Sequence, residues 1–128
     1  MDALCTKSAT ELADLIKKNE TSSKEVVKAH LNRISEINPD LNAITLTLEE
    51  SALKAAEKAD NATDEDRKKP FHGVPFTIKE NIDFKGTPTT QGVPLLAESM
   101  PPRNAPIVDR MMEAGAIPIG RTNLPEMG

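Results

Sequence analysis

The stretch GVPFTIKENID, residues 73 to 83, carries the clearest structural pattern in the chain. Apolar and polar residues alternate along it, so Val74, Phe76 and Ile78 are expected on one face of a β-strand. The same alternation places Lys79 on the opposite, polar face. On this pattern alone, the simplest interpretation of Lys79 is a solvated lysine at the end of a strand.

Length and composition set the broad class. The 128 residues are enough for one domain, and 38% hydrophobic residues can form a modest, mainly aliphatic core because aromatics are only 2%. The net charge of −4 argues against direct binding to nucleic acid. No apolar run is long enough to span a bilayer, so no membrane partner is expected. The single cysteine, Cys5, excludes an intrachain disulfide and favours a reducing compartment, so we expect a cytoplasmic location.

Two serine–glutamate patterns predict helix starts in the first half of the chain. Ser8 with Glu11, and Ser22 with Glu25, each match a capping box. Apolar residues follow both boxes at helical spacing. Pro39 is expected to end the second helix.

The region before residue 71 is expected to contain one further strand and one further helix. Residues 41–48 alternate well enough for a short strand, and the alanine-rich residues 49–60 are typical of a helix. Residues 61–70 contain one apolar side chain and end in proline, so an exposed loop is expected there. This loop separates a helical segment, residues 1–60, from a second segment, residues 71–128.

The second segment predicts a strand–loop–helix–strand unit. After the strand that ends near residue 79, Asn104 is expected to cap a helix carrying Ile107 and Val108, and Gly115 to end it. Residues 116–120 are expected to form a short apolar strand. Such a unit is typical of the α/β class with a mixed or parallel sheet.

Two other residue patterns are considered as sites of chemistry, and neither is expected to be one. The two histidines, His30 and His72, lie far apart without cysteine or carboxylate partners, so no metal site is expected. Ser51 and Lys54 match the S-x-x-K pattern of acyl enzymes, but the accompanying signatures are absent.

The acidic residues after the strand and its terminal lysine allow more than one interpretation. Glu80 and Asp83 are more simply explained by a solvated turn than by paired catalytic acids, which must converge on one bond. A lysine side chain acts as a base only in its neutral form, which burial and hydrogen bonding favour. The rigid strand around Lys79 would suit such a base.

Residues 71–94, FHGVPFTIKENIDFKGTPTTQGVP, and residues 105–128, APIVDRMMEAGAIPIGRTNLPEMG, together resemble the amidase signature family. The resemblance rests on three ordered motifs. They are Gly-Val-Pro-x-x-x-Lys-acid-Asn-Ile-Asp, Gly-Thr-Pro-Thr-Thr and Ala-Gly-Ala-Ile-Pro-Ile-Gly-x-Thr-Asn. It implies that residues 1–128 are the N-terminal portion of a single amidase domain, with the family's α/β/α layered fold, a mixed sheet and a helical N-terminal segment.

The resemblance also implies a chemistry. Members of the family hydrolyse linear amides with a serine–cis-serine–lysine triad, without a cofactor or a metal. Lys79 matches the triad lysine and is the catalytic residue that we expect in this chain. The expected partner is a small-molecule amide substrate.

The chain departs from the family pattern at three places. Glu80 stands where an aspartate is common and Arg121 where a lysine is common, although neither position belongs to the triad. The segment that holds both triad serines would lie beyond Gly128, so we expect an N-terminal fragment that is inactive alone. Because a fragment exposes sheet edges and apolar helix faces, self-association is also expected.

Two alternative functions remain open from the sequence. The chain could belong to the amidase-like subunit of a glutamine-dependent tRNA amidotransferase, in which the same triad releases ammonia to a partner subunit. It could instead be a truncated, non-catalytic interaction module whose motif residues serve only as scaffold.

Overall fold

Three strands form one mixed sheet at the centre of the molecule. The computed structural model describes residues 2–128. Strand β1 spans Ile44–Thr47, β2 spans Pro75–Lys79 and β3 spans Ile117–Thr122. The central strand, β3, pairs parallel with β2 and antiparallel with β1. The expected α/β class and the mixed sheet are therefore confirmed.

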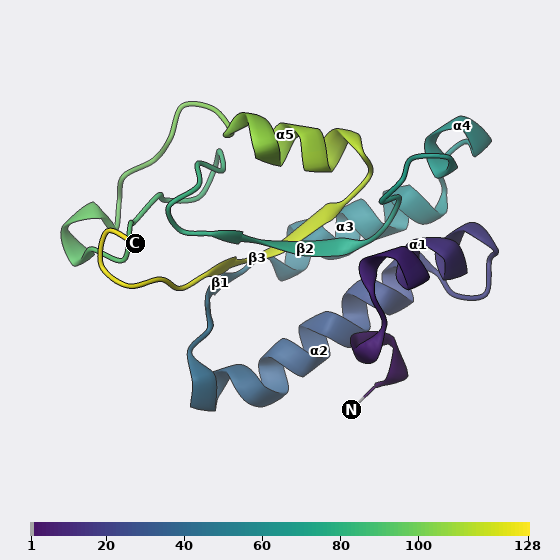
Figure 1. Ribbon diagram of the computed structural model, residues 1–128, viewed down its shortest axis with the longest axis horizontal. Coiled ribbons are helices and arrows are strands. Elements are labelled where there is room, and N and C mark those ends of the chain that lie inside the picture. Colours follow the sequence, from purple (N-terminus) through teal and green to yellow (C-terminus); the bar gives the residue numbers. More distant parts are fainter. Residues whose placement is uncertain (1) are drawn as a thin grey trace.

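Helices cover both faces of this sheet (Figure 1). They are η1 (Ala3–Thr6), α1 (Ala9–Lys17), α2 (Ser23–Leu41), α3 (Glu49–Asp60), α4 (Asp64–Arg67), η2 (Pro94–Leu96) and α5 (Pro106–Glu113). In Figure 1, α5 lies above the strands, α2 lies below them and α3 lies behind them. This arrangement is the expected α/β/α layering. No helix within residues 2–128 combines the length and the apolar character needed to cross a membrane.

Both predicted capping boxes are present. The side chain of Ser8 accepts a hydrogen bond from the backbone of Glu11, and the carboxyl group of Glu11 accepts one from the backbone of Ser8. Ser22 and Glu25 repeat this reciprocal pair at the start of α2. These local bonds satisfy backbone N–H groups that the helix itself leaves free, which explains why the helices begin where the pattern predicts.

The expectation that Pro39 ends α2 is wrong. The helix continues to Leu41 and ends at Asn42, whose backbone is left-handed (φ 50°) and donates to the carbonyl of Asn38 at 2.7 Å. The side-chain amide of Asn38 also makes two 2.8 Å hydrogen bonds with the backbone of Ile44. Proline removes a single donor from the last turn, and these bonds to the chain that follows hold that turn in place.

The main apolar core lies between α2, α3 and β3. Its buried members are Val27, Leu31, Ala52, Ala56, Ile117 and Ile119. The two alanines of α3 recur at helical spacing and are almost completely buried. Their small side chains allow α3 to pack closely on β3 and on α2.

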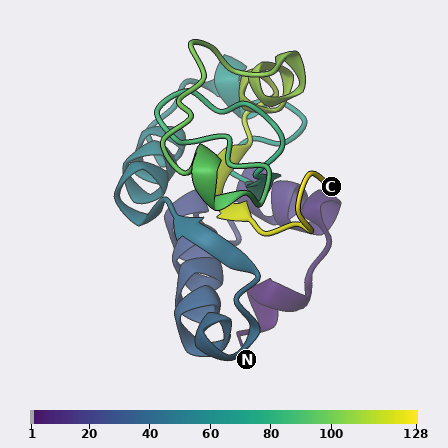
Figure 2. The same ribbon diagram turned by 90° about the vertical axis from the view of Figure 1, so that its left-hand side faces the viewer.

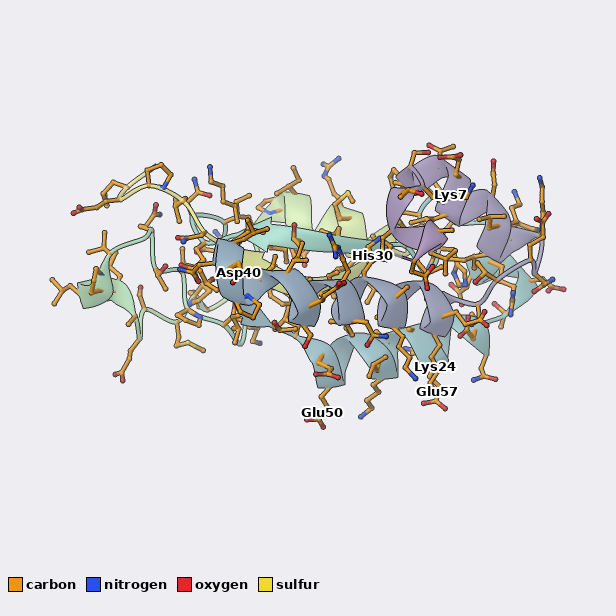
Figure 3. The ribbon with its side chains drawn as sticks, turned by 90° about the horizontal axis from the view of Figure 1, so that it is seen from below. Lys7, Lys24, His30, Asp40, Glu50 and Glu57 are labelled. Carbon is orange, nitrogen blue, oxygen red and sulfur yellow. The ribbon has the colours of Figure 1, made fainter. Side chains whose placement is uncertain are left out.

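A polar contact joins the start of α2 to the end of α3. The carboxyl group of Asp60 accepts hydrogen bonds from the backbone N–H of Ser23 at 2.7 Å and of Lys24 at 3.0 Å. The side chains of Lys24 and Glu57 lie 3.7 Å apart beside it, where Figure 3 shows them projecting together from the two helices. Asp60 thus caps a helix other than its own.

The segment at residues 61–70, expected to be a loop, contains the short helix α4. Thr63 caps this helix by accepting a hydrogen bond from the backbone of Asp66. Arg67 donates to the carbonyl of Asp60 at 2.5 Å and to the side chain of Asn19 at 3.1 Å. The segment is largely exposed, yet these bonds attach it to the helical layer.

Candidate active site

Lys79 is the last residue of β2 and lies at the end of the sheet where the parallel strands β2 and β3 both finish. It lies opposite Thr122, the last residue of β3. Val74 and Ile78 are buried whereas Thr77 and Lys79 are exposed, as the predicted alternation requires. Pro75 and Phe76 are both half-buried, so the alternation is weaker at the start of the strand. In α/β sheets, ligands commonly bind beyond the carboxyl ends of parallel strands.

The chain around the carboxyl ends of β2 and β3 is irregular and folds back on the strand ends. Figure 1 shows residues 80–105 and the C-terminal residues beyond the carboxyl ends of β2 and β3, and Figure 2 views the molecule from that side. The two segments are joined, because the backbone of Met127 donates to the carbonyl of Gln91 at 2.8 Å. The candidate site is therefore built from loops that a rigid sheet positions.

Hydrogen bonds fix the backbone of Lys79 although its side chain is exposed. Its carbonyl accepts from the backbone N–H of Ile82 at 2.9 Å and from the guanidinium of Arg121 at 3.3 Å. The next residue, Glu80, donates its N–H to the carbonyl of Thr122 at 3.0 Å. The lysine thus projects from a backbone that is held on both sides.

Arg121 lies beneath this turn with 1% of its surface exposed. Its guanidinium donates to the hydroxyl of Thr87 at 2.5 Å and to the carbonyl of Ile82 at 2.9 Å. Within residues 2–128, its Nε is the one fully buried side-chain nitrogen or oxygen that lacks a hydrogen-bond partner. Burial lowers the pKa of Arg121, and the negative charges of Glu80 and Asp83 oppose that shift.

Glu80 is also buried, at 8% exposed, so the expected solvated turn is wrong for this residue. Its carboxyl group accepts hydrogen bonds from the hydroxyl groups of Thr45 in β1 and Thr90 in the loop. Asp83 accepts a 2.7 Å hydrogen bond from Thr89. We call Thr45, Glu80, Thr87, Thr90 and Arg121 the Glu80–Arg121 cluster. Little in the sequence indicates this cluster, because Thr45 and Arg121 lie far along the chain from the members between them.

The helix after the loop does not begin as the sequence suggested. Its N-cap is Ala105, and Asn104 lies one residue outside the helix. The side chain of Asn104 accepts a hydrogen bond from the backbone of Lys85 at 2.8 Å and donates to Asp109 at 2.7 Å. Asn104 therefore ties the loop to α5 and does not cap the helix.

The other candidate residues from the sequence do not lie at the carboxyl end of β2. Ring nitrogens of His30 and His72 lie 2.8 and 3.0 Å from the backbone carbonyl oxygens of Val26 and Ala59. The hydroxyl of Ser51 donates to a backbone carbonyl at the start of α3. Across residues 2–128, no group of three or more His, Cys, Asp or Glu side chains is placed to hold a metal ion.

Comparison with known proteins identifies the family. Residues 25–128 match the family model described as Amidase, so the chain belongs to the Amidase family.

Two relatives and one solved structure illustrate the similarity. An indoleacetamide hydrolase of Bradyrhizobium diazoefficiens is 44% identical over 124 residues, which are 93% of this chain and 23% of that protein. A glutamyl-tRNA(Gln) amidotransferase subunit of Thermoanaerobacter pseudethanolicus is 38% identical over 116 residues, covering 91% and 24%. A structure of fatty acid amide hydrolase superposes with a TM-score of 0.88 at 32% identity, covering 96% and 22%. The chain thus spans about a quarter of the length of each.

Proposed function

We propose that this chain supplies the general base of an amidase and that Lys79 is that base. The observation that carries the proposal is the position of Lys79 in a member of the Amidase family. It projects, exposed, from the carboxyl end of a parallel strand whose backbone is fixed by hydrogen bonds. A base held in this way meets a substrate without first ordering its own backbone.

The proposed reaction is hydrolysis of a carboxylic amide through an acyl-enzyme. The rest of the complete enzyme is proposed to cover Lys79 and so favour its neutral form. The amine then accepts a proton from a bridging serine, which in turn takes the proton of a nucleophilic serine. The nucleophile attacks the amide carbonyl, the C–N bond breaks, and the nitrogen leaves with the returned proton. Water then releases the acid and restores the serine.

Both serines are proposed to come from the part of the family's length that this chain does not span. The relatives it matches are about four times longer. We therefore propose that the 128 residues do not hydrolyse amides by themselves. We also propose that they self-associate, because Leu41 and Ile107 leave large apolar side chains exposed.

A second candidate function is that of an amidotransferase subunit. The 38% identity to a glutamyl-tRNA(Gln) amidotransferase subunit favours it, as the 44% identity to an indoleacetamide hydrolase favours a free-standing amidase. In an amidotransferase subunit, glutamine would be the amide and a co-purifying subunit would receive the ammonia.

The third candidate is a non-catalytic interaction module, in which Lys79→Ala would leave partner binding intact. For all three functions we propose a cytoplasmic location, on the basis of the single cysteine.

The first experiment is a blot of source cells with an antibody against this chain. A product several-fold larger than 13.9 kDa supports a longer, complete amidase. A product of 13.9 kDa would favour the interaction module and direct the work to binding partners.

The second experiment measures ammonia release by the longest native form from indoleacetamide, a fatty acid amide and glutamine. Lys79→Ala is expected to lower kcat by roughly 10²- to 10⁴-fold, because it removes the base. Lys54→Ala, an exposed lysine on α3, is the matched control and should leave kcat unchanged. Full activity in the Lys79 variant would refute the proposed role.

A further inference from the structure

We propose that Arg121 is a positioning residue for Lys79, acting on the lysine's backbone from beneath the strand end. The inference rests on the proposed function, because it assumes that the placement of the Lys79 amine matters for turnover. Arg121 itself is buried, so it is not proposed as a catalytic residue.

The contacts of Arg121 converge on the turn that follows Lys79. One guanidinium nitrogen, Nη2, donates to the carbonyls of both Lys79 and Ile82, at 3.3 and 2.9 Å. The turn is closed by its own hydrogen bond, from the N–H of Ile82 to the carbonyl of Lys79 at 2.9 Å. Arg121 therefore holds both ends of a single turn, and this turn sets the direction in which the lysine leaves the strand.

The guanidinium is itself held in place. Arg121 lies opposite Ile78 in the register of β2 and β3, so its side chain starts beside the end of β2. Its other terminal nitrogen, Nη1, donates to the hydroxyl of Thr87, and that hydroxyl donates onward to the carbonyl of Phe84 at 2.9 Å. Moving the guanidinium would require the loop to move with it.

The burial of a charge at this point also favours a specific role. Removing a guanidinium from water is costly, and an apolar side chain of similar size is often as stable at a buried position. Here the charge is retained although Nε has no partner. What an apolar side chain could not provide is a set of donors that reaches two carbonyls and a hydroxyl together.

The test uses the longest native form and compares Arg121→Met and Arg121→Lys with Val27→Ala. Val27 is buried in the core between α2, α3 and β3, so its truncation lowers stability without touching the turn. Arg121→Met is expected to lower kcat roughly a hundredfold with little change in KM, because a misplaced base weakens the reaction more than binding. Arg121→Lys keeps the charge with fewer donors and should restore part of the loss. Val27→Ala should lower the Tm and leave kcat unchanged.

A second readout does not depend on activity. Hydrogen exchange of the Ile82 amide should accelerate roughly tenfold in Arg121→Met, because that amide donates within the turn that loses its support. It should not change in Val27→Ala. If Arg121→Met does not fold, Thr87→Val removes the hydroxyl that holds the guanidinium and should show the same two effects at smaller size.

The outcomes separate this inference from the proposed function. Arg121→Met and Thr87→Val could lose stability, as Val27→Ala does, and still keep the parent's kcat and Ile82 exchange rate. That result would show that Arg121 is structural and would overturn the inference. Full activity in Lys79→Ala would instead refute the proposed function. In that case, faster Ile82 exchange in the Arg121 variants would still support the contact and show that it serves no turnover by Lys79.

Discussion

Replacement of Asp60 by alanine tests how α2 and α3 are joined. The carboxyl group of Asp60 accepts two hydrogen bonds from backbone N–H groups at the start of α2. The loss of each bond lowers the free energy of unfolding by a different amount. Ser23 is fully buried, so its N–H would lose its partner without gaining water, at about 1.5 kcal/mol. Lys24 is exposed, so water replaces the carboxyl group there and the loss is about 0.5 kcal/mol. The capping box at Ser22 is unaffected, so the expected total is about 2 kcal/mol.

The assay is equilibrium unfolding of the purified chain in urea, followed by circular dichroism. Asp60→Asn keeps one oxygen for the buried N–H of Ser23 and should cost about half as much, roughly 1 kcal/mol. Asp40→Ala, on the exposed turn at the other end of α2, is the matched control and should stay within about 0.5 kcal/mol. An alanine variant at position 60 as stable as the parent, or equal losses in the alanine and asparagine variants, would refute this reasoning.

Two further predictions concern association and acid stability. Light scattering of the purified 128-residue chain should report a mass above 13.9 kDa, because exposed apolar side chains such as Leu41 and Ile107 favour contacts between copies, and a clean monomer would contradict this. Hydrogen bonds from the N-cap serines lower the pKa values of Glu11 and Glu25 from the ordinary 4.5, so their contribution to stability is complete above pH 4.5 and is lost as the pH falls through the lowered values. Thermal unfolding of Glu11→Gln with Glu25→Gln should therefore depend less on pH in this acidic range, and an unchanged pH dependence would count against it.

The parts of the fold that the sequence predicted are those determined by neighbouring residues. A capping box closes within four positions, and Gly115, with φ 94°, ends α5 by letting the next N–H groups bond back to the last turn. The alternation before Lys79 is equally local. The prediction for Pro39 fails because the bonds that keep the helix intact come from Asn38 and its contact with Ile44, which the proline rule does not consider.

The candidate site could be predicted only in part. The motif around Lys79 indicates the residue and the end of its strand. Glu80 and Arg121 stand out as departures from the family pattern, but nothing in the sequence shows that both are buried in one cluster. Their partners are threonines, which are common and carry no distinctive pattern, and Thr45 lies 35 positions from Glu80. Such a cluster follows from the packing of distant segments and is invisible to spacing rules.

The wide separation of the Glu80–Arg121 cluster along the chain has a consequence for biosynthesis. Thr87 and Arg121 are 34 positions apart, and contacts of this kind form only after a long loop has closed. Helices α1 and α2, by contrast, begin from bonds within a single turn. A chain that folds while it is being synthesised would therefore form its helices early and fix the backbone around Lys79 only after residue 121 has left the ribosome.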